Sequence, residues 1–214
     1  MVELAIYAFL AAFIFFRLYN SLGKTSELQP SHHSQPISIV MEDNIQGYDD
    51  NDTDIESIIE NCSENEISII NYIKKKDKEF SLKHFMDGSM KAFEIIIKAF
   101  NEGNAHILSM LLDNNLYNSF LEEIENRRTL GQHYEDVIVS ITYQKITKLK
   151  LLENTAYITV KFITEQINFV KDNNGNIIHG NTSKINKIED TWTFKKDITL
   201  LSNKKWYLTS IQAV

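Results

Sequence analysis

Residues 85–104 read FMDGSMKAFEIIIKAFNEGN, and this stretch decides how the domain is built. Its polar side chains recur at helical spacing, so that they form one narrow stripe along a helix. The stripe consists of Asp87, Lys91, Glu94, Lys98, Asn101 and Glu102. Every other side chain is apolar or small. So wide an apolar arc must be covered by a membrane, by a partner protein or by the rest of the domain.

The charges of the stripe favour the domain's own sheet as the cover. Asp87 stands four residues before Lys91, and Glu94 stands four before Lys98, a spacing that stabilises an exposed helix face. A helix lying on anionic lipid would instead carry an excess of Lys and Arg on its polar face. We therefore predict that the stripe faces solvent. The bulky side chains expected to cover the concave face of a curved sheet are Phe93, Ile96, Ile97 and Phe100.

Helices come first in the chain and strands follow. Ser63 and Glu66 have the spacing of a capping box, Ser81 is a helix cap, and another helical stretch runs from 105 to Gly131 with a break at 113–115. Strand-like stretches then follow at 136–150, 155–170, 185–198 and 205–213, with DNNGN (172–176) as a hairpin turn. This order predicts an α+β fold, with N-terminal helices packed on a curved antiparallel sheet of about four strands.

The third of these strands, IEDTWTFKKDI (188–198), carries an acid on its apolar side. Alternation places Asp190 on the same face as Trp192 and Phe194. A carboxylate in that position either lies in solvent at the end of the strand or accepts hydrogen bonds in a cavity. Both alternatives stay open. The candidate pocket or partner-binding residues are Phe93, Phe100, Gln166, Asp190, Trp192 and Phe194.

The N-terminus, MVELAIYAFLAAFIFFRLYN, has no charged residue from Leu4 to Phe16. It is near the lower limit of the ~17–25 residues that span a bilayer, and its positive charges follow the apolar run, unlike those of a signal peptide. We predict a single-pass anchor over 1–22, with the C-terminal domain on the cytoplasmic side of the membrane. A buried N-terminal helix is the alternative. The anchor residues are Leu4, Phe9, Phe13, Phe16 and Arg17.

An acidic segment follows the predicted anchor. Residues 1–66 hold two basic and twelve acidic side chains, a net charge of −10, whereas the remaining residues have a net charge of +3. We predict a flexible linker over 23–62 and one domain over 63–214.

The sequence gives no sign of a metal site or of a catalytic cysteine. His32 and His33 lack further ligands at metal-site spacing, and Cys62 lies among acids that disfavour a thiolate. We expect neither a metal nor another cofactor, and the lack of a basic block with aromatics argues against nucleic-acid binding.

The ordered stretches FMDGSMKAFEIIIKAFNEGN, LYNSFLEEIENRRTLGQ, AYITVKFITEQI, KIEDTWTFKKD and WYL resemble one family. It is the C-terminal domain of the forty-four-kilodalton subunit of the mitochondrial inner-membrane translocase, and above all its alphaproteobacterial relatives. Ser89 and Asn104 depart from the family's more frequent Ala and Asp. The resemblance implies a cone-like α+β domain, related to cystatin-like and nuclear-transport-factor-like folds. The matching residues are Phe85, Gly88, Ala92, Phe93, Ala99, Phe100, Gly103, Glu165, Gln166, Ile167, Asp190, Trp192, Thr193 and Phe194.

The resemblance implies a non-catalytic adaptor or scaffold, acting in protein translocation or membrane-protein assembly. With the alphaproteobacterial relatives as the nearest match, the implied location is the bacterial inner membrane, with the C-terminal domain in the cytoplasm. The implied partners are the inner membrane, an anionic lipid such as cardiolipin, and membrane or secretory proteins. The part of the family that recruits an Hsp70 chaperone has no evident counterpart before Ile67.

Two alternative functions use the space between helices and sheet. The first is a small-molecule enzyme, in which Asp190 and Gln166 would work with His133 or His179 as a base. No spacing in the sequence joins these histidines to the two strand residues. The second alternative is a lipid tail held by the aromatic side chains Phe93, Phe100, Trp192 and Phe194.

Overall fold

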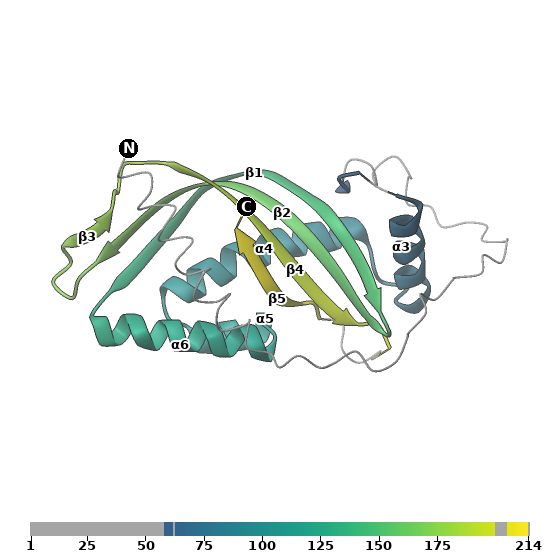
Figure 1. The fold of residues 1–214 in the computed structure, drawn as a ribbon, viewed down its shortest axis with the longest axis horizontal. Coiled ribbons are helices and arrows are strands. Elements are labelled where there is room, and N and C mark those ends of the chain that lie inside the picture. The colour runs from purple at the N-terminus through teal and green to yellow at the C-terminus, as the bar shows by residue number, and fades with distance from the viewer. Residues whose placement is uncertain (1–57, 62, 200–204, 214) are drawn as a thin grey trace, which may run out of the picture.

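The computed structural model describes residues 58–61, 63–199 and 205–213. In this part of the chain an antiparallel sheet arches over the helices (Figure 1). Helices α4, α5 and α6 lie beneath the concave face of the sheet, and α3 stands at one end of it. The α+β prediction is confirmed. The helices are α3 (Glu64–Lys76), α4 (Leu82–Asn101), α5 (Ala105–Leu111) and α6 (Asn114–Leu130).

Local capping residues set where the helices begin and end, as predicted. The capping box forms at the start of α3, where the backbone N–H of Ser63 donates to the Glu66 carboxylate over 2.9 Å. Ser81 caps α4. The expected break at 113–115 is the start of α6, where the Asp113 side chain is the cap. The helix ends at Gly131, whose φ of 63° is a left-handed conformation that glycine adopts without strain.

The sheet has five strands where we predicted about four. The additional strand is β3, which pairs with β2 through the confirmed turn at 172–176. Only four residues long, β3 is too short to show an alternating pattern in the sequence. The four longer strands are neighbours in the order β1-β2-β4-β5. The strands are β1 (His133–Leu152), β2 (Thr155–Lys171), β3 (Ile177–Gly180), β4 (Asn186–Asp197) and β5 (Tyr207–Ala213).

Helix α4 packs on the sheet in the orientation that its sequence predicts. Phe93, Ile96 and Phe100 are buried, and the charged residues of the stripe are exposed. Within the stripe, Lys98 lies 3.9 Å from Glu102, four residues further along the helix. Such an exposed pair contributes little to stability, so the packing of α4 comes from its apolar arc.

Aromatic rings fill the space between α4 and the sheet. The Phe93 ring centroid lies 4.7 Å from that of Phe162 and 4.5 Å from that of Trp192. Nearer the start of α4, the Phe85 ring meets the edge of Phe194 at 5.8 Å. Contacts of this kind add to the free energy gained by burying apolar area. The apolar part of the concave side is thus occupied by the protein's own side chains.

A buried carboxylate joins α6 to strands β4 and β5. Asp113 accepts hydrogen bonds from Lys195 Nζ at 2.7 Å, from Thr209 Oγ1 at 2.6 Å and from the Leu116 backbone N–H at 2.9 Å. Burial alone would raise the pKa of Asp113. The hydrogen bonds from Lys195, Thr209 and Leu116 outweigh it, so the pKa lies below its ordinary value.

Replacing Asp113 with alanine is expected to lower the free energy of unfolding by about 2–3 kcal/mol, because both the helix cap and two side-chain hydrogen bonds are lost. Urea unfolding followed by tryptophan fluorescence measures the change. Asp87→Ala, at an exposed position of α4, is the matched control and should change stability far less. Equal effects of the two substitutions would contradict this role of Asp113.

The described core begins before the predicted domain boundary. Ile59 falls in the predicted linker, yet it is only 2% exposed and forms a parallel bridge with Ile146 of β1. Among the helices that the structure describes, none is both long and apolar enough to cross a bilayer. The predicted anchor over 1–22 lies outside the described residues and stays a prediction.

Candidate functional site

The six side chains selected from the sequence are all buried. Four of them, Phe93, Phe100, Trp192 and Phe194, are aromatic and belong to the core between helices and sheet. The other two, Gln166 and Asp190, lie on the same concave face at its polar end. Their role as a pocket or a partner site stays a prediction.

The concave face of β2 changes from apolar to polar along the strand. After Phe162, the inward positions are Thr164, Gln166 and Asn168. Gln166 Nε2 donates to Thr164 Oγ1 at 2.8 Å, and Asn168 Nδ2 donates to Gln166 Oε1 at 3.1 Å. The same Asn168 amide also donates to Asp136 Oδ1 of β1 at 2.8 Å. A row of hydrogen-bonded polar side chains therefore leads from the core toward the end of the sheet that carries β3.

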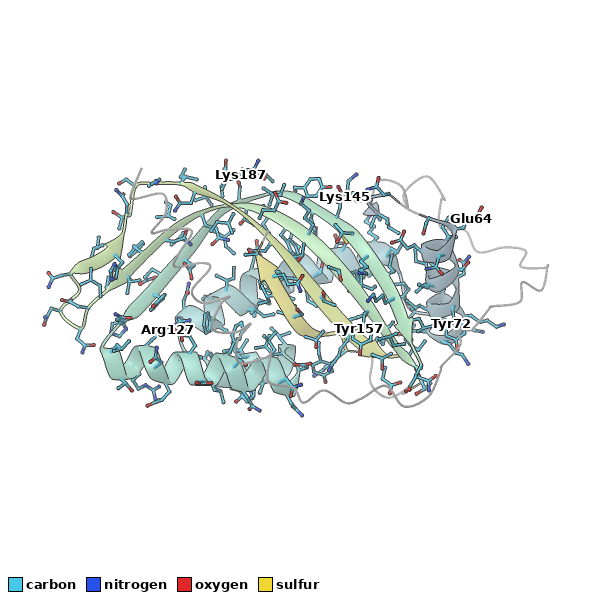
Figure 2. The ribbon with its side chains drawn as sticks, viewed as in Figure 1. Glu64, Tyr72, Arg127, Lys145, Tyr157 and Lys187 are labelled. Atoms are coloured by element: carbon cyan, nitrogen blue, oxygen red, sulfur yellow. The ribbon has the colours of Figure 1, made fainter. Side chains whose placement is uncertain are left out.

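Arg127 extends this polar region from the helical side. Figure 2 labels it on α6, on the side of that helix that faces the sheet. Its guanidinium lies over the Phe100 ring at 3.6 Å and over the Tyr134 ring at 4.2 Å, and its Nε is 3.5 Å from Glu123 Oε1. Burial lowers the pKa of Arg127, while the charges of Glu123, Tyr134 and Asp136 act in the opposite direction.

Two carboxyls of this region influence each other. Burial raises the pKa of Asp136, against the hydrogen bond from Asn168 and the charge of Arg127. Burial, together with the charge of Asp136, raises the pKa of Asp190 to about 7. The carboxyl of Asp190 is therefore partly protonated at neutral pH.

Several buried polar atoms of this region lack a hydrogen-bond partner among the described residues. In native proteins such atoms are rare, and each costs about 1–3 kcal/mol unless water or a ligand supplies the partner. We call the group Asn101, Arg127, Asp136, Gln166, Asn168 and Asp190 the Asp190 cluster. The unpartnered atoms are Asn101 Oδ1, Arg127 Nη2, Asp190 Oδ1 and, beside the cluster, Trp192 Nε1, whereas Arg127 Nε is held in its ion pair with Glu123.

The two histidines considered as catalytic bases lie apart from the cluster. His133, at the start of β1, is exposed, and its Nε2 lies 3.2 Å from Asn173 Oδ1. His179 is an exposed residue of β3. Within the described ranges, no hydrogen bond or ion pair joins either ring to Asp190 or Gln166. The same ranges hold no group of three or more acidic, His or Cys side chains placed to bind a metal; His32, His33 and Cys62 lie outside them.

Comparison with known proteins places this chain in a family. The model of the Tim44-like domain matches residues 68–213. The plant protein "Mitochondrial import inner membrane translocase subunit TIM44-1" of Arabidopsis thaliana is 23% identical over 124 residues, which are 58% of this chain and 26% of the plant protein. This chain thus spans about a quarter of that relative's length. The uncharacterised protein RP434 of Rickettsia prowazekii is 25% identical over 230 residues, covering all of this chain and 98% of RP434.

Among solved structures, the intermembrane-space region of the chloroplast protein ARC6 aligns with a TM-score of 0.41 and 10% identity, over 60% of this chain and 95% of that structure. The family match runs from within α3 to the end of β5. The chain belongs to the Tim44-like domain family.

Proposed function

We propose that this chain is a membrane-held, non-catalytic adaptor that acts in protein translocation or in the assembly of membrane proteins. The observation that carries this proposal is the Tim44-like match over residues 68–213. The name of the plant relative, an import subunit of an inner-membrane translocase, points to the same process. We further propose that the segment 1–22 is the anchor and that the residues between it and Ile59, which packs in the core, are the linker that would let the domain reach partners near the bilayer.

The interior of the domain supports binding over catalysis. Phe93, Phe162 and Trp192 pack on one another between α4 and the sheet, which supports their role as core and not as the lining of a substrate pocket. Asp190 has no base or nucleophile bonded to it among the described residues. The partners that we propose are membrane or secretory proteins and an anionic lipid such as cardiolipin.

Deleting residues 2–16 is expected to move the protein from the membrane fraction to the soluble fraction, because most of the apolar run is removed. Fractionation of cells that carry the full or the shortened chain, with a salt wash of the membranes, measures this. Replacing Arg17 with lysine, which keeps the charge, is the control and should leave the protein in the membrane. If the shortened chain also resists the salt wash, the anchor proposal is wrong.

The role in transport has a separate test. Cross-linking of the full chain in its native membrane should capture translocase components or chains in transit, and depletion of the protein should slow the export or insertion of membrane proteins. Pulse-labelling of precursor and mature forms measures the second effect. Unchanged export and insertion after depletion would contradict the adaptor proposal, whatever the location of the protein.

A further inference from the structure

Lysine side chains line the outer, convex face of β1 over the part of the strand that lies toward α3. The register of β1 with β2 puts the buried Ile146 and Leu149 on the concave face and the lysines beside them on the convex face. Figure 2 shows Lys145 on the outer side of the arch, and Lys148 and Lys150 are exposed. We call these three lysines the lysine strip. Since a strand advances about 3.3 Å per residue, the strip is roughly 17 Å long.

The lysine strip has no acidic neighbour of the kind that another lysine of the same face has. Lys161 of β2 lies 2.5 Å from the Glu189 carboxylate of β4. Within the described ranges, no ion pair joins an acid to the strip, and this includes the exposed Glu153 of the turn after β1. Lys145 lies directly opposite Lys161 in the register, and like charges in that position repel each other. Negative charge from another part of the chain would therefore stabilise this face.

The chain enters the described domain beside the lysine strip. Ile59 forms a parallel bridge with Ile146, and the backbone N–H of Glu60 donates to the Ile146 carbonyl at 2.8 Å. A hydrogen bond with β4 raises the pKa of Lys161, and the charge of Glu60 adds to this effect, as expected of a carboxylate near the convex face. Because Ile146 lies between the first two lysines of the strip, the residues before 59 leave the domain at the strip itself.

Those preceding residues carry the charge that the strip lacks. Residues 42–56 hold seven acidic side chains, and no Lys or Arg occurs from 25 to 73. Five of the seven acids fall within 49–56, so only a few residues separate them from the bridge at Ile59. Exposed ion pairs are individually weak. A short tether, however, makes their formation intramolecular, with an effective concentration on the order of millimolar.

We propose that the acidic segment 42–56 docks on the lysine strip of its own domain, where its carboxylates pair with Lys145, Lys148 and Lys150. β1 is an edge strand of the described sheet, and proteins commonly cover or charge such edges. The docked segment occupies the lysines that a polyanionic partner would otherwise meet, so it is an internal competitor whose strength falls with salt. It also shortens the free part of the linker while it is bound. This inference goes beyond the adaptor role and does not depend on it.

Acetylation of lysines, followed by mass spectrometry, tests the contact on the purified full chain in a neutral detergent. The test variant combines the substitutions D49N, D50N, D52N, D54N and E56Q. At low ionic strength we expect it to raise the acetylation rate of the lysine strip about 2- to 10-fold over the parent protein. In about 1 M salt, where the screening length is about 3 Å, the two proteins should react alike. Lys91, exposed on α4, is the internal reference and should react equally in both.

Two controls show whether the effect is specific to this segment. A variant that combines D87N, E94Q and E102Q also removes exposed negative charge, but from α4, and should leave the acetylation of the strip unchanged. Zero-length carbodiimide cross-linking of the parent protein should join residues 49–56 to the lysine strip. It should do so in preference to Lys75 and Lys76, which are exposed at the end of α3 and also near the segment in the chain.

Three outcomes would overturn the proposal. The first is that the parent protein and the variant with five substitutions are acetylated at the strip at the same rate at low salt. The second is that the cross-links of 49–56 go mainly to Lys75 and Lys76. The third is that vesicles with anionic lipid protect the strip equally in the two proteins, which would make lipid the occupant and exclude competition from the segment. None of these results bears on protein transport, so the adaptor proposal stands or falls separately.

Discussion

Replacing Phe93 with alanine is expected to lower the free energy of unfolding by roughly 3–5 kcal/mol, the range for truncating a fully buried aromatic side chain. The Phe93 side chain is 0% exposed. Its ring lies between Phe162 of β2 and Trp192 of β4, so the substitution opens a cavity where α4 meets the centre of the sheet. Urea unfolding followed by tryptophan fluorescence measures the loss, and Trp192, one of the two tryptophans, lies in this contact.

Ile95→Ala is the matched control for this prediction. Ile95 lies two residues further along the same helix and is 44% exposed, so its truncation removes little buried area. We expect a loss below about 1 kcal/mol. If the Phe93 variant lost no more than the Ile95 variant, the aromatic stack would not be a main source of the stability of the domain.

The parts of the fold that depend on neighbours in the chain could be predicted from the sequence. Ser63 and Ser81 mark helix starts, and Gly131 marks a helix end, because caps act on backbone groups within one turn. The buried face of α4 also follows from its own periodicity. Strand β3 could not be predicted, since its identity comes from pairing with β2 and its sequence is too short to alternate.

The candidate site could be predicted only in part for the same reason. Alternation along β4 places Asp190 on the inner face, and this was expected. Nothing in the sequence indicates that Arg127 is buried at this site, because it precedes Arg128 at the end of α6, where basic residues are normally exposed. In the structure the Arg128 side chain is 72% exposed and pairs with Glu125, whereas that of Arg127 is 5% exposed. The contacts of Arg127 with Phe100 of α4 and Tyr134 of β1 distinguish the two arginines, and they place the buried one where its charge acts on Asp136.

The second large effect concerns pH. Asp190 has an ordinary pKa of 3.8, which burial and the charge of Asp136 raise to about 7 in the folded protein. Between these values the folded state holds a proton that the unfolded state has released, so the free energy of unfolding falls as pH rises from about 4 to 7. Above about pH 7 the carboxyl is charged in both states and the loss is complete. For this one group the loss amounts to about 4 kcal/mol at most.

The Asp190→Asn variant separates this effect from every other titration. An amide of the same shape holds no ionisable proton, so the variant should match the parent protein near pH 4 and become more stable than it above about pH 7. Urea unfolding of both proteins across this range, in phosphate and acetate buffers free of amines, measures the difference. Asp136 also has a raised pKa. Its own contribution to the pH dependence of stability is present in both proteins and cancels in the comparison, apart from its coupling to Asp190. A difference between the two proteins that does not change with pH would mean that the pKa of Asp190 is not raised in the folded protein, and this prediction would be wrong.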